Sequence, residues 1–169
     1  TEIGKVLGIA RNKIKVSVRR VGGGFGGKES AVPLSAVPAA LAARKLRKPV
    51  RITLERFDDM ALTGHRHPFL FHYNIAVTPE SKLLDMEMRC WSNAGHSADL
   101  SPIVTSVCIT HIDNCYKFPN LDVYGRPCRT NLASNTAFRG FGGPQGMFAT
   151  ETAMRHVAET MGFDVDEVC

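Results

Sequence analysis

The sequence predicts an α+β fold of mixed sheets with helices. Two patterns predict it: segments in which apolar and polar residues alternate, as in half-buried strands, and Ala- or Leu-rich runs that prolines open, as in helices. A length of 169 residues with 44% hydrophobic and 22% charged residues is ordinary for a globular domain with a sizeable core.

The first third of the chain is expected to contain two strands around one helix. Residues Lys13–Val21 place three aliphatic side chains on one face of a strand, which a glycine cluster ends. The following Ala- and Leu-rich run predicts a helix from about Pro38 to Leu46, because proline fits only in or before a first helical turn. The segment VRITLERF, residues 50–57, has the composition of a strand.

The rest of the chain predicts a hairpin followed by two helices. FLFHYNIAV and LLDMEMRCW are strands joined by the turn TPESK, and a helix is expected near Thr105–Asn114. LDVYGRPCR is extended, and TNLASNTAFRGFGG forms a long loop. A last helix runs from Pro144 to about Met161 and ends at Gly162.

We expect residues 1–169 to form one structural unit, because no Pro/Ser linker or low-complexity tract divides them. The chain opens at Thr1 without an initiator Met and stops within helix-like DVDEVC. The unit is therefore expected to be part of a larger domain, truncated at both ends.

Composition argues against nucleic acid and membrane as partners. The net charge of +5 comes from residues spread along the chain. The one basic run, Arg44–Arg51, lies where a helix should end, and cations there interact favourably with the helix dipole. No stretch approaches the roughly 18 apolar residues of a spanning helix, and no signal pattern opens the chain. A cytoplasmic protein is expected, with the peroxisome as the alternative.

Neither the cysteines nor the histidines predict a metal site. The five cysteines are odd in number and never in CxxC spacing, so we expect reduced structural thiols. His65 and His67 would face the same side of a strand, and His111 and Cys115 lie four residues apart, but neither pair has a third ligand at plausible spacing. The cysteines are Cys90, Cys108, Cys115, Cys128 and Cys169.

The tetrapeptide GFGG occurs twice, at Gly24–Gly27 and at Gly140–Gly143, each time before a predicted helix. Glycines let the backbone adopt positive φ and approach a ligand, and a helix N-terminus favours an anion. Two such loops predict an elongated anionic cofactor. The alternative from another class is a non-enzymatic module that binds an anion or nucleotide.

Nucleotide motifs fit the first loop poorly. Gly22–Lys28 follow the Walker pattern, but Glu29 occupies the Ser or Thr position and would repel phosphate. The same glycines satisfy GxGxxG, yet the nearest acid beyond the helix, Glu55, lies within a predicted strand rather than at its end. In either loop the phenylalanine is a plug in the core or a ring presented to a flat ligand.

The stretches VGGGFGGKE, DNCYKFPN and TNLASNTAFRGFGGPQG resemble the molybdopterin-binding region of the xanthine dehydrogenase and aldehyde oxidase family, the molybdenum hydroxylases. The resemblance runs nearly end to end, and it explains both glycine loops. It implies part of a molybdopterin-binding domain.

The resemblance also implies an activity. These enzymes hydroxylate a carbon next to nitrogen, as in a purine, or an aldehyde carbon, with oxygen from water. Electrons leave the molybdenum–molybdopterin through two [2Fe-2S] clusters and FAD to NAD or oxygen. A homodimer is implied, and this chain alone should be inactive because the family's general-base glutamate is expected beyond Cys169.

Roles carry over where the motifs match. Phe25 and Gly26 would lie beside the molybdenum, with Gly24 shaping the backbone there. Arg139 would contribute a main-chain contact near the metal, or its guanidinium would bond loop carbonyls. Phe141 resembles one of two rings that sandwich the substrate.

Two further residues have alternative roles. Glu29 matches the substrate-orienting glutamate of xanthine dehydrogenases, where many aldehyde oxidases have an apolar residue. Its alternative role is a first-turn carboxylate that the helix dipole favours. Gln145 could hydrogen-bond the cofactor or cap the start of the last helix.

One position departs from the xanthine dehydrogenase pattern. In PIVTSVCITHIDN, Val107 occupies the place of a substrate-polarising arginine. Such a donor usually supplies a large electrostatic part of catalysis, and valine cannot. An aldehyde or another N-heterocycle, such as a nicotinate-like compound, is therefore a serious alternative to xanthine.

Overall fold

The structure, a computed structural model, describes residues 2–168. The chain divides into two compact units, Thr1–Gly64 and His65–Cys169, where the sequence predicted one. The division comes where few contacts cross, without the Pro/Ser linker that such a boundary often carries. The two units are described separately.

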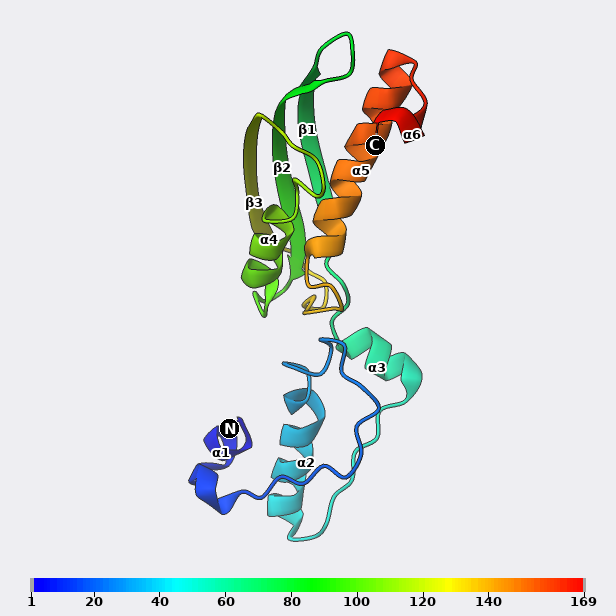
Figure 1. The fold of residues 1–169 in the computed structure, drawn as a ribbon. Helices are drawn as coiled ribbons and strands as arrows, with labels where there is room; N and C mark the ends of the chain where they lie inside the picture. Colours follow the sequence, from blue (N-terminus) through cyan, green and yellow to red (C-terminus); the bar gives the residue numbers. More distant parts are fainter. Residues whose placement is uncertain (1, 169) are drawn as a thin grey trace. The chain divides into compact units, whose positions relative to one another are not determined.

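The first unit is helical within its described residues (Figure 1). It contains α1 (Glu2–Leu7), the short 3-10 helix η1 (Arg11–Lys13), α2 (Pro33–Leu46) and α3 (Arg56–Leu62). Helix α1 packs against α2. Gly4 is the only fully buried residue among residues 2–64, so this unit has almost no core of its own.

Three predictions for the first unit were wrong. Lys13–Val21 and residues 50–57 are not strands; α3 takes up the end of the latter segment, with Asp58 and Asp59 in its first turn. Val16 and Val18 stay exposed, because a strand needs a hydrogen-bonded neighbour and residues 2–64 contain none. Helix α2 begins at Pro33, five residues before the predicted start, and keeps Pro38 inside it.

The second unit contains the α+β fold that was predicted (Figure 1). A three-stranded mixed sheet has the order β1-β2-β3, with β1 antiparallel and β3 parallel to β2. The hairpin and the last helix are confirmed, whereas α4 begins and ends earlier than the expected Thr105–Asn114. The elements are β1 (Phe69–Val77), β2 (Leu83–Gly95), α4 (Ser101–Ile109), β3 (Asn120–Arg129), α5 (Gly143–Met161) and α6 (Val165–Val168).

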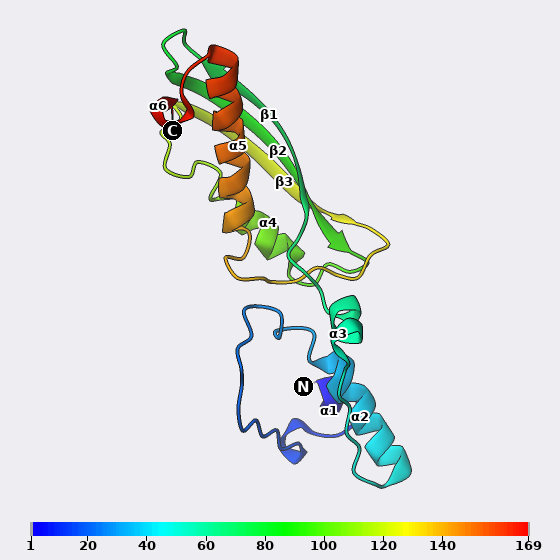
Figure 2. The same ribbon diagram turned by 90° about the vertical axis from the view of Figure 1, so that its right-hand side faces the viewer.

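Helices α4 and α5 cover one face of the sheet (Figure 2). Alternate residues of β2 point into this layer, and Met86 and Met88 are fully buried there against Ile112 and Ala153. Burying such side chains contributes about 1.5–3 kcal/mol each relative to leaving them exposed. This sandwich of sheet and helices holds the long loop that leads into α5.

The thiols of Cys90 and Cys108 meet inside this layer. Both are buried and free of disulfides, and the hydrogen bond to Cys90, together with burial, raises the pKa of the Cys108 thiol. A thiol with a raised pKa is a poor nucleophile, which agrees with the expected structural role. Cys169 lies outside the described residues.

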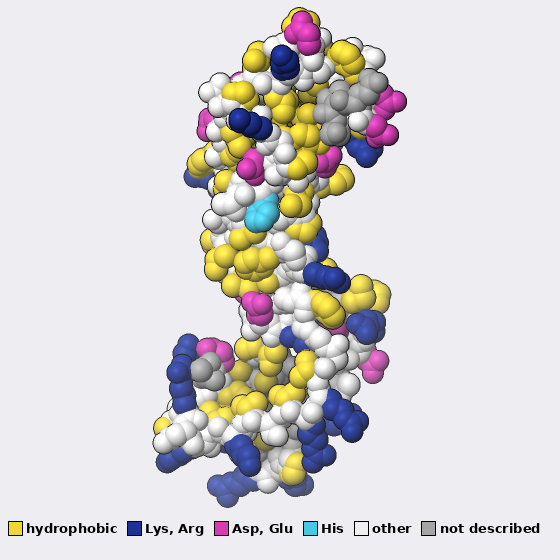
Figure 3. All heavy atoms as spheres, viewed as in Figure 1, with side chains coloured by type: hydrophobic (Ala, Val, Ile, Leu, Met, Phe, Trp, Pro, Cys, Tyr) yellow, Lys and Arg dark blue, Asp and Glu magenta, His cyan; other side chains and the backbone are white. Residues whose placement is uncertain are grey.

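Charge is unevenly divided between the two units, contrary to the expected spread. Thirteen of the 21 Lys and Arg residues but only five of the 16 Asp and Glu residues lie in residues 1–64. Figure 3 shows these cations gathered on the surface of the first unit. The first unit is therefore basic and favours anionic ligands.

Candidate functional site

The second GFGG tetrapeptide forms a tight turn at the start of α5. The amide of Gly143 donates to the carbonyl of Gly140 at 3.0 Å, so Phe141 and Gly142 are the two central residues. Both have positive φ, 51° and 103°. Positive φ at both central positions is the mark of a type I′ turn.

The first GFGG tetrapeptide repeats this turn in the other unit. The amide of Gly27 donates to the carbonyl of Gly24 at 2.9 Å, and Phe25 and Gly26 have φ of 49° and 96°. A bulky residue in the left-handed region costs about 1–3 kcal/mol, and such strain clusters at functional sites. The repeated sequence therefore encodes a repeated, strained backbone conformation, in which phenylalanine as well as glycine has positive φ.

The two phenylalanines have different surroundings. Phe25 is 64% exposed, so within the described residues it does not plug the core of its unit. Phe141 is half-buried. The exposure of Phe25 favours the interpretation of its ring as presented to a ligand. Phe141 is partly covered and partly accessible, so its surroundings fit either interpretation.

Close packing against α4 requires glycine at two positions in and just after the second turn. A Cβ on Gly142 would lie 2.2 Å from the carbonyl oxygen of Val104, and one on Gly146 would lie 2.5 Å from that of Cys108. The turn and the first residues of α5 thus pack backbone to backbone against α4. Val107 lies between Val104 and Cys108 in sequence, so the departure from the xanthine dehydrogenase pattern falls in the segment of α4 that the turn packs against.

The first turn does not stand at a helix N-terminus, contrary to the prediction. Helix α2 begins at Pro33, so Glu29 lies four residues before it, and the helix-dipole explanation for Glu29 is wrong. Glu29 is exposed, and its amide donates to the carbonyl of Gly26 at 3.3 Å. Only the second turn leads directly into a helix, with Gly142 at the N-cap of α5.

Arg66, which the sequence analysis did not select, holds the second turn. Its guanidinium donates to the carbonyl oxygen of Arg139 at 2.5 Å and to Oε1 of Gln145 at 3.4 Å, and lies 4.7 Å from the ring centroid of Phe138. The side chain of Arg139 itself is exposed. No spacing in the sequence connects Arg66 to a loop 73 residues away.

Gln145 does not cap the start of α5, and its hydrogen bond to the cofactor stays a prediction. Its amide bridges Arg66 and the carbonyl oxygen of His67, to which Nε2 donates at 3.4 Å. The start of α5 has no side-chain cap. Gln145 also lines a hollow of about 410 Å³ beside the turn, together with Arg66, Phe69, Phe71, Pro144 and Phe148.

His67 is a buried structural histidine. It precedes β1 rather than lying on a strand, and its Nε2 is 2.7 Å from Oγ of Ser101 on α4. Burial lowers the pKa of His67, against a smaller opposing effect of Asp99. Within residues 2–168, no group of three or more His, Cys, Asp and Glu side chains could hold a metal ion.

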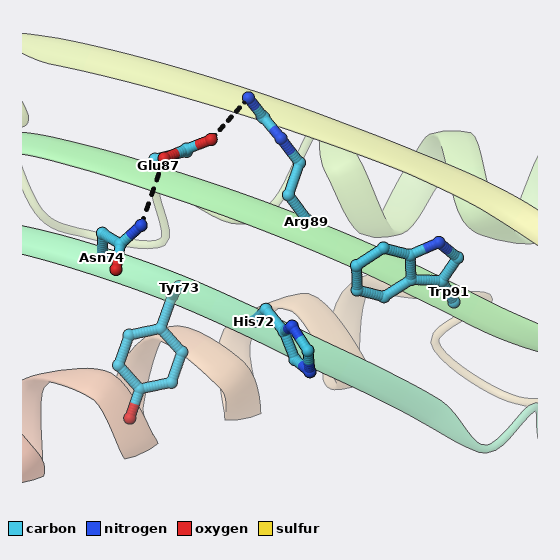
Figure 4. Close-up of a pocket in the computed structure, with 6 residues that line it drawn as sticks. All are labelled: His72, Tyr73, Asn74, Glu87, Arg89 and Trp91. Atoms are coloured by element: carbon cyan, nitrogen blue, oxygen red, sulfur yellow. Dashed lines mark hydrogen bonds and ion pairs between the residues drawn. The ribbon is translucent and has the colours of Figure 1, made fainter.

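The open face of the sheet carries a second hollow, of about 510 Å³ (Figure 4). Arg89 bonds Glu87 and Asp122 there at 2.7 Å each, and the hydrogen bond from Arg89 lowers the pKa of Asp122. The rings of Trp91 and His72 lie edge to face, with their centroids 5.3 Å apart. None of the predicted site residues lies in this hollow.

The predicted site residues are thus divided between the units. Gly24, Phe25, Gly26 and Glu29 belong to the first, and Arg139 and Phe141 to the second. Within the second unit, Arg66 bonds the main chain of Arg139 and the side chain of Gln145. The turn that contains Phe141 packs against the segment of α4 in which Val107 lies. That the two turns share one site stays a prediction.

We expect Gly142→Ala to destabilise the chain far more than Gly162→Ala. Both glycines have positive φ, but a Cβ at Gly162 meets no atom within 4 Å. The control should lose about 1–2 kcal/mol through conformation alone. Gly142→Ala adds the collision with Val104 and should lose about 3 kcal/mol or more in urea denaturation. Equal losses would contradict the close packing described.

We expect His67 to weaken the fold in acid. Because its folded-state pKa is lowered, the unfolded chain takes up a proton first as the pH falls below about 6.5. The contribution of neutral His67 to the free energy of unfolding is complete above that pH, and it is lost as the pH falls toward the folded-state pKa. Urea midpoints at pH 7.5 and 5.5 should differ less in His67→Gln than in the parent. His72→Gln, an exposed control, should keep the parental difference.

Among residues 2–168, no helix has the length and apolar character needed to cross a membrane. This finding concerns the helices of the described residues alone.

The whole chain, residues 1–169, matches the family described as molybdopterin cofactor-binding domain. It is 51% identical to a xanthine dehydrogenase of Calliphora vicina and 48% identical to a nicotinate hydroxylase of Emericella nidulans, each over 98% of this chain and 12% of the relative. The solved aldehyde oxidoreductase of Desulfovibrio gigas matches with a TM-score of 0.77 and 32% identity, over 87% of this chain and 16% of that one. The chain, which spans about an eighth of the length of these curated relatives, therefore belongs to the molybdopterin cofactor-binding domain family.

Proposed function

We propose that this chain is part of a molybdenum hydroxylase, in which the two GFGG turns contribute to the binding of molybdopterin and substrate. The observation that carries the proposal is the repeated turn, with phenylalanine and glycine held at positive φ in both copies. Strain of this kind persists only where the surrounding structure maintains it, and it favours a function for the turn. Membership of the molybdopterin cofactor-binding domain family supplies the ligand.

The residues present fit an anionic, partly aromatic group. The first turn lies in a unit rich in Lys and Arg, and it exposes the Phe25 ring with Gly24 beside it. In this proposal Phe25, Gly24 and Gly26 would contact the cofactor, and the main chain of Arg139 would lie near the metal. When bound, the cofactor supplies two-electron oxidation of a substrate carbon, with oxygen from water.

This chain's own contribution to the substrate comes from two side chains in the proposal. The Phe141 ring, accessible at the start of α5, stacks on a flat substrate; such aromatic contacts add about 1 kcal/mol beyond burial. The Glu29 carboxyl hydrogen-bonds a ring nitrogen or exocyclic oxygen and orients the substrate. The loss of the helix-dipole explanation for Glu29 supports this role.

Val107 directs the choice of substrate away from xanthine. It lies in the segment of α4 that the Phe141 turn packs against, and in this proposal an arginine there would reach a substrate stacked on that ring. A nicotinate-like heterocycle or an aldehyde needs no such arginine in this proposal. The names of the relatives include a xanthine dehydrogenase, a nicotinate hydroxylase and an aldehyde oxidoreductase, so similarity alone does not select one.

The remaining parts of the proposal concern the parent protein. Electrons pass through two [2Fe-2S] clusters and FAD to NAD or oxygen, the enzyme is a homodimer in the cytoplasm or peroxisome, and the general base comes from outside this chain.

The proposal is tested by purifying the full-length parent protein and measuring its molybdenum content and its turnover of xanthine, nicotinate and an aromatic aldehyde. We expect about one molybdenum per subunit, with nicotinate or the aldehyde oxidised faster than xanthine. Absence of molybdenum would favour the other class considered, a non-enzymatic module that binds anions. Xanthine turnover well above the other two substrates would contradict the argument from Val107.

We expect Val107→Arg in the full-length enzyme to raise kcat/KM for xanthine by about tenfold or more relative to nicotinate. The reason is electrostatic, because a donor near developing negative charge typically changes rates by 10²–10³. Steady-state kinetics with both substrates measure the ratio. Val107→Met, which adds length without charge, is the control and should leave the ratio within about twofold of the parent.

A further inference from the structure

The second GFGG turn follows another turn along the loop into α5 and is itself followed by the first hydrogen bond of that helix. The amide of Phe141 donates to the carbonyl of Phe138 at 2.7 Å, that of Gly143 to Gly140 at 3.0 Å, and that of Gly146 to Gly142 at 3.2 Å. The carbonyl of Arg139 lies between the first two acceptors and points instead to Arg66. None of these three backbone bonds uses the carbonyl of Arg139. The Arg66 guanidinium donates to it instead and so holds the loop at that residue.

We infer that Arg66 is a positioning residue, which holds the main chain of Arg139 and the ring of Phe141 in place for the proposed site. This inference rests on the proposed function for its effect on catalysis. Its structural part rests only on contacts within the second unit.

Arg66 is itself fixed from both sides. Thr136 donates its amide to the carbonyl of His65 at 3.1 Å, and the His65 amide donates to Oδ1 of the buried Asn135 at 3.3 Å. On the other side, His67 is buried and bonded to Ser101 of α4. Because both neighbours are anchored, the guanidinium reaches the turn from a defined starting point.

The contacts of Arg66 need a guanidinium. One nitrogen donates to the Arg139 carbonyl and another to Gln145, while the planar group lies over the Phe138 ring. A planar fork can make these contacts together, whereas the ammonium of lysine is a single point of charge. Cation–π contact with Phe138 adds to the restraint on the loop.

The restraint matters because Phe141 has an unfavourable backbone conformation. With φ at 51°, this residue gains by relaxing to negative φ once its neighbours are free to move. Gly142 is held by its packing on α4, so the mobile side of the turn is the one that Arg66 holds. Relaxation there would displace the Phe141 ring and the Arg139 main chain together.

The test compares Arg66→Met and Arg66→Lys in the full-length enzyme, with Arg126→Met as the matched control. Arg126 lies in the same unit, with its guanidinium 5.8 Å from the centroid of the Tyr124 ring, but on β3. Four quantities are measured: molybdenum per subunit, kcat and KM, amide hydrogen exchange of the peptide that covers residues 138–146, and the unfolding midpoint.

We expect Arg66→Met to speed exchange in residues 138–146 and to lower kcat/KM by about 10- to 100-fold, with KM raised, since misplacement by 1 Å can cost 10²-fold. Arg66→Lys should recover part of the loss, because it keeps one donor to the carbonyl. Arg126→Met should stay within about twofold of the parent in both measurements.

Two outcomes would overturn the inference. One is an Arg66→Met enzyme with parental exchange and KM. The other is a loss of activity that follows a lower unfolding midpoint, with KM unchanged and no recovery in Arg66→Lys, which indicates a role in folding alone. A parent protein without molybdenum would end the proposed function, whereas the exchange measurement would still decide whether Arg66 holds the turn.

Discussion

The second unit depends on the close approach of two backbones, that of Gly142 and Gly146 to that of α4. At 2.2 Å and 2.5 Å from carbonyl oxygens, the positions of their missing Cβ atoms leave room for hydrogen alone. This approach sets where α5 begins and packs the Phe141 turn against the segment of α4 in which Val107 lies. Phe141, one of the two residues proposed to contact substrate, therefore owes its position to helix packing above a mixed sheet.

The loop before α5 completes the arrangement by polar contacts rather than by a core. Asn135 donates its side-chain amide to the carbonyl of Asn93 at 2.8 Å, and its backbone amide donates to Ala94 at 3.0 Å, which fastens the loop to the end of β2. Arg66 then holds the carbonyl of Arg139. Of these groups Asn135 is buried, and leaving a buried polar group unpaired would cost about 1–3 kcal/mol, which favours this one conformation of the loop.

The first unit contains the same Phe–Gly turn, but without a buried core around it. Its helices bury almost nothing, and Phe25 is exposed. Its apolar surfaces, such as those of Val16 and Val18, are of a kind that proteins cover with further structure. The chain spans 12% of the length of the xanthine dehydrogenase relative that it matches.

The sequence pattern predicted an element correctly where the residues that stabilise it lie close by in the sequence. The alternation in β1 and β2 and the short TPESK turn predicted the hairpin, because both strands find their partner next to them in sequence. Pro144 and Gly162 marked the two ends of α5 for similar reasons. The residues 13–21 carry the same alternation but have no partner strand among residues 2–64, so the same pattern yields no strand.

The sequence by itself determined the family, the helices and hairpin of the second unit, and the special character of the two glycine motifs, because these depend on residue identity and short-range spacing. Only the tertiary structure decided that Gly142 serves packing and that Arg66 holds a loop 73 residues away. The physical reason is that these contacts join segments distant along the chain. No periodicity or propensity records which carbonyl a guanidinium will reach once the sheet and helices have packed.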